Sequence, residues 1–560
     1  MRCQDGAVTE LLIVSVAALL VIAGSAVVGP RLGVASPLVL VGIGVGASLM
    51  PIFASVRIEP EWILEGVLPP LLYSSAVSMP AMNFRREFGA ISGLSVLLVV
   101  GSALALGVFF MVVIPDVGFA WGVALGAIIS PTDAVATSII KQTSVSKRVV
   151  AMLDGESLLN DATALVLLRT AIVATAASFA FWGAVGTFAY SVVVAVAIGW
   201  VIGRGNLMVR KRVTDSTVNT VISFTVPFVA SVPAELLGAS GLVAAVVAGL
   251  ITGIRAPRDL SPRNRLSDSQ NWRTVELVLE GTVFLTMGLQ IRAIVTDVRN
   301  DHGGVGTAVL IAAGALLLTI AVRAAFVAPL LRLLTANVRR GEQIQPRLEG
   351  MQEKMSTAAG KQQMLERANS KRRKVSEHDL DRLARRVTKG LANIEYFLRE
   401  PLGWREGTAV VWAGMRGAVT VAAAQTLPED TPQRSVLVLI AFAVALLSLV
   451  VQGGTIGPLL RLLPPDADQP TSREQLRAEQ TRIMELMRTS AQSIPEPEHV
   501  DEEPTFQQAR AHRLAVIDAQ RSALLDARDN GTFDADVLAN ALANLDASEI
   551  AIELRGTLIS

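Results

Sequence analysis

Residues 151–169, AMLDGESLLNDATALVLLR, decide how the rest of the chain is interpreted. The stretch is apolar enough to form a membrane-spanning helix, yet Asp154, Glu156, Asn160 and Asp161 fall within about two helical turns of it. A carboxylate at membrane depth costs about 3 kcal/mol or more, so an acid that is kept there indicates a functional site by default. The remaining sequence is therefore interpreted as a scaffold that holds these acids.

The polar residues of this stretch share one side of the predicted helix. Glu156 and Asn160 are four residues apart, and so are Ser157 and Asp161, so each pair lies on one helical face and the two faces are adjacent. Asp161 lies near the middle of the span, where it is predicted to release a proton in order to bind a small cation, and then to do the reverse. The alternative is a structural aspartate that stabilises helix packing through hydrogen bonds.

Composition indicates a membrane protein. Of 560 residues, 51% are hydrophobic, and a mean hydropathy of +0.48 is too high for a soluble domain of this size. Lys and Arg number 50 against 49 Asp and Glu, so net charge indicates no nucleic-acid partner. Cys3 is the only cysteine, which excludes an internal disulfide and a metal cluster built from cysteines. The first apolar run is predicted to be a retained span rather than a signal peptide.

Hydropathy predicts an all-α polytopic membrane protein with about thirteen transmembrane helices, each long enough for a hydrocarbon core of about 30 Å. The predicted spans are 7–28, 34–53, 62–79, 88–114, 119–140, 149–177, 181–202, 218–232, 240–254, 272–294, 305–334, 408–427 and 436–463. Loops after the odd-numbered spans carry Lys and Arg, whereas only Arg57 follows the second, fourth, sixth and eighth spans. This alternation predicts an outside N-terminus and a cytoplasmic C-terminus.

Hydropathy also divides the chain into parts. Residues 1–335 and 406–463 are predicted to form the membrane domain, the second range supplying its last two helices. Residues 336–405 are a charged cytoplasmic insert. Residues 464–560 are predicted to form a cytoplasmic tail that is helical in three pieces, typical of a small helical domain or a dimer contact, and no motif in it specifies a ligand or partner.

The fifth and twelfth spans are each predicted to be broken at membrane depth. In the fifth, Pro131 removes a backbone hydrogen bond directly before Thr132 and Asp133. A broken helix frees carbonyl groups and helix ends, from which many transporters build cation sites. A proline kink with a capping aspartate is the alternative, and the presence of Asp161 in the next span favours the cation site.

In the twelfth span, Arg416 lies between Gly414 and Gly417. Its guanidinium cannot deprotonate, so it must meet a carboxylate or the carbonyl groups at a helix C-terminus. The two broken spans are seven apart, an odd offset that inverted-topology repeats require. We therefore expect spans one to six and eight to thirteen to be the repeats, with the seventh as linker.

Glu156 and Arg323 are predicted to form an ion pair. Counted at 1.5 Å per residue, each lies about 6–8 Å cytoplasmic of the midpoint of its span. Pairing them compensates both charges and leaves Asp161 as the group that can exchange its ligand.

Several motifs together resemble the sodium/proton exchangers, the monovalent cation:proton antiporters. They are SPTDAVA, GESLLNDATALVLL, FLTMGL, GMRGAVTVAAA and VQGGTIGPLL, in this order across most of the predicted membrane domain. The resemblance implies an antiporter, commonly a homodimer, in which a mobile core domain carries the ion past a dimerisation domain by an elevator-like movement. Many relatives have an acid after the PPLLF of the third span, where this chain has PPLLY followed by Ser74 and Ser75.

By position, the resemblance identifies Asp161 as the ion- and proton-binding aspartate, with Asn160 directly before it as a second residue of the ion- and proton-binding site. The resemblance also implies that Thr132 and Asp133, in the unwound fifth helix, and Ser157 are further residues of the cation site. It assigns Glu156 and Arg323 to a supporting ion pair. Arg416 and Pro131, which the two broken spans single out, are expected to have supporting roles. An Asn-Asp pair resembles the electroneutral branch of the family.

The resulting hypothesis is a secondary transporter of the plasma membrane that exchanges Na⁺, or Li⁺, for H⁺. Its partners are monovalent cations, protons, the lipid bilayer and a second copy of the chain. We expect neither an enzyme activity nor a cofactor beyond the transported ions, and no phosphate-binding G-x-x-x-x-G-K-[ST] motif occurs. The alternatives are K⁺/H⁺ exchange on the same fold, a cation channel and a non-transporting membrane sensor.

Overall fold

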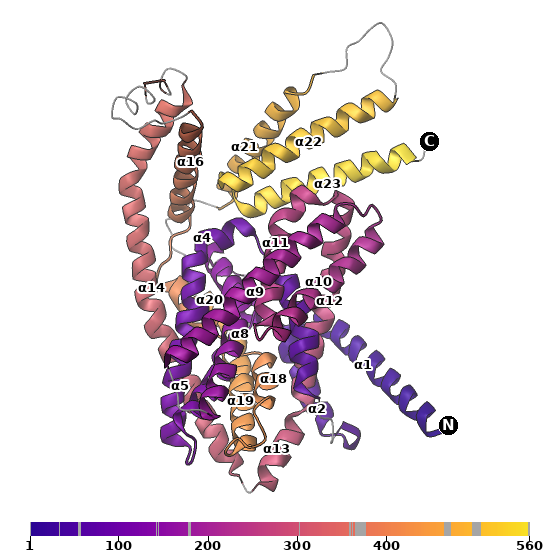
Figure 1. The fold of residues 1–560 in the computed structure, drawn as a ribbon, viewed down its shortest axis with the longest axis vertical. Helices are drawn as coiled ribbons and strands as arrows, with labels where there is room; N and C mark the ends of the chain where they lie inside the picture. The colour runs from indigo at the N-terminus through magenta and orange to yellow at the C-terminus, as the bar shows by residue number, and fades with distance from the viewer. Residues whose placement is uncertain are drawn as a thin grey trace. The chain divides into compact units, whose positions relative to one another are not determined.

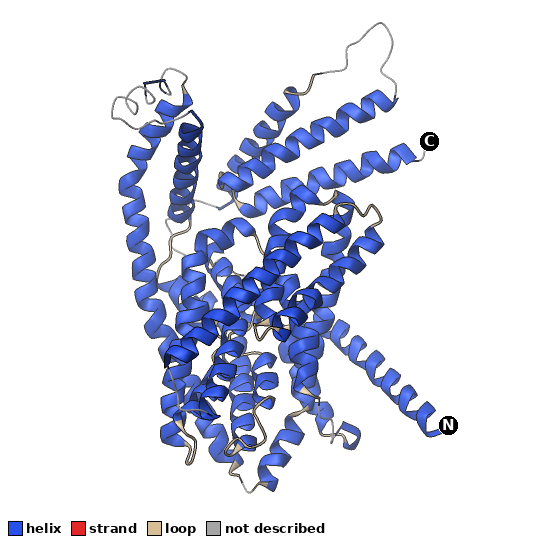
Figure 2. Cartoon of the chain, in the orientation of Figure 1, coloured by secondary structure: helices blue, strands red, loops and turns tan. Residues whose placement is uncertain are grey.

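The computed structural model describes residues 2–32, 34–53, 58–141, 143, 145–176, 181–301, 303–357, 360, 362–363, 377–463, 472–495 and 506–557. The regular elements in these ranges are all helical, which confirms the predicted all-α class (Figures 1 and 2). Among the described residues, nine helices are long and apolar enough to cross a membrane. Two shorter apolar helices, Ser36–Ser48 and Phe119–Ile129, accompany them.

The chain forms two compact units. The membrane unit comprises Met1–Ala256, Leu266–Leu330 and Trp404–Pro464. The polar unit comprises Pro257–Arg265, Leu331–Gly403 and Pro465–Ser560. Hydropathy placed its boundaries after residues 335, 405 and 463, and it did not separate Pro257–Arg265 from the membrane domain.

The helices that belong wholly or in part to the membrane unit begin at the N-terminus and end near residue 463 (Figure 1). They are α1 (Arg2–Leu32), α2 (Ser36–Ser48), η1 (Pro51–Phe53), η2 (Trp62–Val67), α3 (Leu68–Ser78), α4 (Ala81–Ser92), η3 (Gly93–Leu98), α5 (Val99–Val113), α6 (Phe119–Ile129), α7 (Val135–Ile140), α8 (Lys147–Ala176), α9 (Phe181–Arg210), α10 (Ser216–Leu236), α11 (Gly241–Asp259), α12 (Pro262–Leu289), α13 (Ile291–Asn300), α14 (Val305–Ser356), α17 (Trp404–Trp412), α18 (Ala418–Gln425), α19 (Arg434–Ser448), η4 (Leu449–Gly453) and α20 (Gly454–Leu462).

Each of the thirteen predicted spans falls on one helix or on consecutive helices of this set. The largest difference concerns α14, which does not end near residue 334 but continues to Ser356 and has 52 residues. Its polar second half is rich in Arg, Glu, Gln and Met, which are good helix formers, so the helix continues beyond the apolar part. Hydropathy located the end of the apolar segment, which is not the end of the helix.

One group of helices in the membrane unit, here called the site bundle, contains α4–α8, the start of α14 and α17–α20. Within it α5 and α6 lie in backbone contact, because a side chain at Gly122 or Gly126 would meet the backbone of Gly107 or Ala103. Small residues permit such close helix approach in membranes. This contact fixes α6, which leads directly into the first broken segment.

The other group, here called the scaffold bundle, contains α1–α3 and α9–α12. Trp272 of α12 lies at its centre, with its ring centroid 5.2 Å from that of Tyr73 and 5.0 Å from that of Phe224. The Trp272 indole Nε1 also donates a hydrogen bond of 2.9 Å to Ser223. These contacts attach α12 to α3 and α10.

The polar unit is helical as well. It contains the second half of α14, α16 (Glu377–Arg399), α21 (Ser472–Gln492), α22 (Phe506–Asn530) and α23 (Ala535–Thr557). The last three helices pack side by side (Figure 1) around a small core that includes Ile483, Ile517, Leu524 and Leu538. The tail therefore has the three helical pieces that were predicted.

Ion pairs attach the segment Pro257–Arg265 to the tail. Arg258 pairs with Asp526 at 2.9 Å and with Asp529 at 2.8 Å, and Arg265 pairs with Asp546. This segment connects α11 to α12. The ion pairs therefore join the tail to the start of α12, a helix whose later residues line the cavity described below.

Candidate functional site

Two helices of the site bundle are interrupted opposite one another. The first interruption separates α6 from α7, and the second separates α17 from α18. The Asp133 backbone N–H donates a hydrogen bond of 2.7 Å to the Met415 carbonyl oxygen, which joins the two segments. A side chain at Gly417 would collide with the Asp133 carboxylate, so the close approach requires glycine at this position.

Arg416 occupies the second interruption and is almost fully buried. Its Nε donates a hydrogen bond of 3.0 Å to the carbonyl oxygen of Ile129, the last residue of α6, and its Nη1 donates to the Gly414 carbonyl oxygen. Because the C-terminus of a helix carries partial negative charge, the guanidinium is favourable there. Arg416 therefore meets helix C-terminal carbonyls, one of the two kinds of partner expected from the sequence.

Glu156 and Arg323 lie against each other in the bundle interior, with 1% and 2% of their surfaces exposed. Arg323 donates from Nη1 to Glu156 Oε1 at 2.5 Å and from Nη2 to Oε2 at 2.7 Å. Its Nε donates to the Val410 carbonyl oxygen at 2.8 Å, and Thr132 Oγ1 donates to Glu156 Oε1 at 3.0 Å. Both charges are thus compensated by direct bonds.

Asn160 positions the first broken segment. Its Nδ2 donates to the Thr132 carbonyl oxygen at 3.1 Å and to Thr132 Oγ1 at 2.7 Å. The side chain is fully buried and does not line the cavity beside Asp161. The structure thus places Asn160 behind Thr132, whereas the sequence placed it among the ion-binding residues.

A cavity of about 100 Å³ lies between the two bundles. From the site bundle it is lined by Pro131, Thr132, Asp133, Ser157, Asp161 and Thr420, among others. Asp161 is 9% exposed, and its carboxylate makes no hydrogen bond or ion pair with any residue that the structure describes. The cavity has room for a small cation with bound water, next to a carboxylate that none of the described residues holds.

Two carboxylates that line this cavity were not among the site residues predicted from the sequence. Glu276 and Glu280 line it from α12, on the scaffold side. Ser74, which directly follows PPLLY at the position where relatives often have an acid, donates a hydrogen bond of 3.2 Å to Glu276 Oε2. Both glutamates lie within a predicted span, so the intramembrane-acid criterion that identified Asp161 also identifies them.

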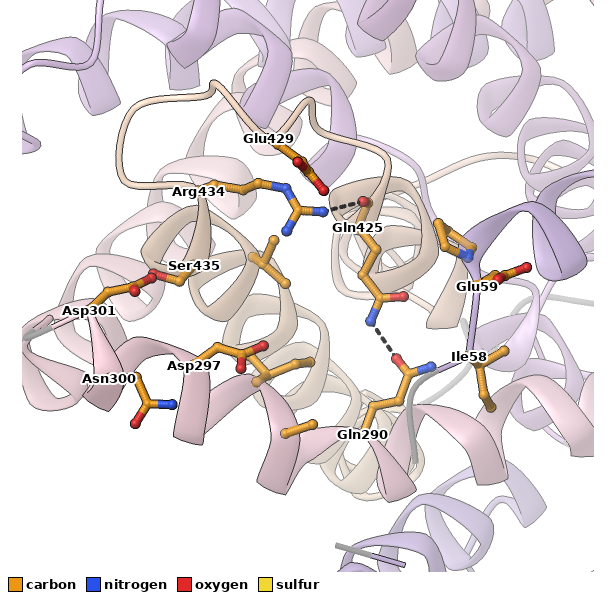
Figure 3. Close-up of a pocket in the computed structure, with 14 residues that line it drawn as sticks. Ile58, Glu59, Gln290, Asp297, Asn300, Asp301, Gln425, Glu429, Arg434 and Ser435 are labelled. Carbon is orange, nitrogen blue, oxygen red and sulfur yellow. Dashed lines mark hydrogen bonds between the residues drawn. The ribbon is translucent and has the colours of Figure 1, made fainter. Parts of the chain in front are cut away.

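A second, larger cavity of about 580 Å³ lies elsewhere in the membrane unit (Figure 3). Acidic side chains line it, namely Glu59, Asp297, Asp301 and Glu429. At its wall Gln425 Nε2 donates a hydrogen bond of 2.5 Å to Gln290 Oε1 (Figure 3). Gln425 ends α18 and Gln290 lies between α12 and α13, so this bond connects the site bundle to the helix that carries Glu280.

The fold is that of a multi-pass membrane protein with a carboxylate-lined cavity beside two interrupted helices. The model of the family described as sodium/hydrogen exchanger, transmembrane, matches residues 13–362 and 382–462. The chain therefore belongs to the sodium/hydrogen exchanger family, whose members exchange cations for protons.

Individual relatives agree with this assignment. The low-affinity Na⁺/H⁺ antiporter NhaS1 of Synechocystis is 24% identical over 87% of this chain and 80% of its own length. The sodium, potassium, lithium and rubidium/H⁺ antiporter of Bacillus subtilis is 29% identical over 47% of this chain and 41% of its own length. The structure of the antiporter MjNhaP1 of Methanocaldococcus jannaschii superposes with a TM-score of 0.56 at 15% identity, covering 82% of this chain and 99% of that one.

Proposed function

We propose that this protein is a secondary antiporter that exchanges Na⁺ for H⁺, with Asp161 as the site that the two ions share. The observation that carries the proposal is the contrast between two buried acids of α8. Glu156 is neutralised by Arg323, whereas Asp161 faces a cavity without a bond to any described residue. Only the second can alternate between a proton and a cation.

The proposed exchange follows from the oxygen atoms around Asp161. Small hard cations prefer oxygen ligands, and Thr132, Asp133 and Ser157 bring hydroxyl, carboxylate and freed backbone oxygens to the same cavity. When the cation leaves, a proton takes its place on Asp161, because a bare carboxylate inside the membrane is unfavourable. One acid that carries one ion at a time makes the exchange electroneutral.

Transport requires that the cavity opens to each side in turn. In this proposal the site bundle moves past the scaffold bundle and carries Asp161 with it, while a homodimer holds the scaffold in place. The alternation of basic loops supports an outside N-terminus and a cytoplasmic C-terminus in the plasma membrane. Membership of a family of exchangers supports the antiport mechanism.

K⁺/H⁺ exchange on the same site is the second candidate. The B. subtilis relative is named for transport of sodium, potassium, lithium and rubidium, whereas NhaS1 is named for sodium. The same carboxylate and hydroxyl groups serve either ion. A cation channel is a different class, because it would pass cations without moving protons.

The test is dissipation of a pH gradient in proteoliposomes, with Na⁺, K⁺ and Li⁺ added in turn. Asp161→Asn should abolish the response to every cation while the protein remains folded. Asp154→Asn is the matched control: it makes the same change on α8 at a residue paired with the half-exposed Lys141, outside the cavity, and should keep exchange. Retained exchange in Asp161→Asn would refute the assignment, and a response to K⁺ alone would favour the second candidate.

A further inference from the structure

The cavity beside Asp161 has two walls that belong to different bundles. Asp133, Asp161 and Thr420 line it from the site bundle, whereas Glu280 lines it from α12 of the scaffold bundle. We propose that the Glu280 carboxylate is a second anionic ligand of the transported cation, contributed from the wall opposite Asp161. This inference rests on the proposed function and adds a residue and a specific role to it.

The position of Glu280 is fixed by the packing of α12. A side chain at the neighbouring Gly281 would meet Ile22 of α1, and Gly288 lies in backbone contact with Gly44 of α2. Trp272, two turns before Glu280, is held by α3 and α10. The Glu280 backbone is therefore anchored in the scaffold, and only its side chain is free to turn within the cavity.

Glu280 differs from the other acid on the same wall. Glu276, one turn earlier, accepts a hydrogen bond from Ser74 of α3, so a scaffold group already engages it. Glu280 makes no hydrogen bond or ion pair with any residue in the described part of the chain. Of the two, Glu280 is the carboxylate that remains available for a ligand.

A buried hydroxyl independently points to a ligand in this cavity. Thr420 is 1% exposed and lines the cavity, yet its Oγ1 has no hydrogen-bond partner among the described residues. A buried polar atom without a partner is unfavourable, and such atoms are normally satisfied by protein, water or a bound ion. An ion within the cavity that is bound by Asp161 and Glu280 would give this oxygen a partner.

A cation ligand on the scaffold bundle should affect cation binding and ion exchange differently. Asp161 moves with the site bundle and remains with the cation, whereas Glu280 stays behind when the bundles separate. Glu280 should therefore strengthen cation binding in the arrangement described here without being needed for the exchange of cation and proton on Asp161. Removing its charge should change the apparent KM for the cation much more than the maximal rate.

The experiment measures exchange against Na⁺ concentration in proteoliposomes containing the full-length chain. Glu280→Gln should raise the KM for Na⁺ about tenfold, since the number of charged ligands sets cation affinity, and should leave the maximal rate largely unchanged. Glu280→Asp, which keeps the charge, should stay closer to the wild type. Glu276→Gln is the matched control, the same substitution one turn away, and should change the KM much less.

Thr420→Val tests the same site even if Glu280→Gln fails to fold. It should also raise the KM for Na⁺. The inference is overturned if Glu280→Gln and Glu276→Gln have the same KM while Asp161→Asn still abolishes exchange; the proposed function then stands alone. It is also overturned if folded Glu280→Gln shows no exchange at any Na⁺ concentration. A folded wild-type protein that exchanges no cation would overturn the proposed function and this inference together.

Discussion

Removing either partner of the Glu156–Arg323 pair should destabilise the protein strongly, and removing both should do little further harm. Glu156→Gln leaves the Arg323 guanidinium buried without its carboxylate, and Arg323→Ala leaves the Glu156 carboxylate buried without its cation. Both side chains are at most 3% exposed and are joined by two hydrogen bonds of 2.5 and 2.7 Å. Water therefore cannot replace the missing partner in either single variant.

The expected magnitude follows from this burial. Breaking a buried ion pair by removing one partner costs about 3–5 kcal/mol, mostly because a charge remains uncompensated. The double variant contains no unpaired charge, so its loss should be close to that of one single variant. The difference between the sum of the single losses and the double loss is then a coupling energy of about 3–5 kcal/mol.

The assay measures the free energy of unfolding of the wild type, the two single variants and the double variant. Unfolding is carried out in mixed detergent and SDS micelles and is monitored by tryptophan fluorescence. A parallel cycle on Asp154 and Lys141 is the control, because this pair has a similar contact of 3.0 Å but side chains that are 28% and 53% exposed. Its coupling energy should stay below about 1 kcal/mol. If the free-energy losses of the two single variants sum to the loss of the double variant within about 0.5 kcal/mol, the reasoning from burial is refuted.

Three further predictions concern the rest of the chain. Gly417→Ala puts a methyl group against the Asp133 carboxylate and should lower the exchange rate about a hundredfold in a folded protein; a normal rate would show that the two broken segments can separate freely. Gln425→Ala removes the bond to Gln290 and should change the maximal rate while the KM for Na⁺ stays constant, because neither amide lines the cavity of Asp161. Deletion of residues 464–560 should leave basal exchange in proteoliposomes, since none of the residues described in this range lines the cavity of Asp161, and complete loss in a correctly inserted protein would contradict this.

Hydropathy and intramembrane charge predicted much of this molecule. A carboxylate in an apolar helix is costly wherever the helix packs, so Asp161 stands out without a structure. Depth along two spans was enough to propose that Glu156 meets Arg323, and the structure places them in contact. Pro131 and the glycines around Arg416 marked the segments where the chain leaves helical geometry.

Other features depend on which side of a helix faces which neighbour, and a single sequence does not contain that information. The cavity wall formed by Glu276 and Glu280 depends on the rotation of α12, which is set by its packing against α1, α2 and α3. Asn160 and Asp161 are adjacent in sequence, yet one lies behind Thr132 and the other faces the cavity. The ion pairs of Pro257–Arg265 with the tail join segments more than 250 residues apart.

The most direct test of the central claim counts both ions in one preparation. Na⁺ uptake and H⁺ release are measured together in proteoliposomes with the membrane potential clamped, for the wild type and for Asp161→Asn. We predict one proton released for each Na⁺ taken up by the wild type, and no movement of either ion through the variant. Na⁺ uptake without proton release, or coupled exchange that persists in Asp161→Asn, would contradict the assignment of Asp161 as the shared site.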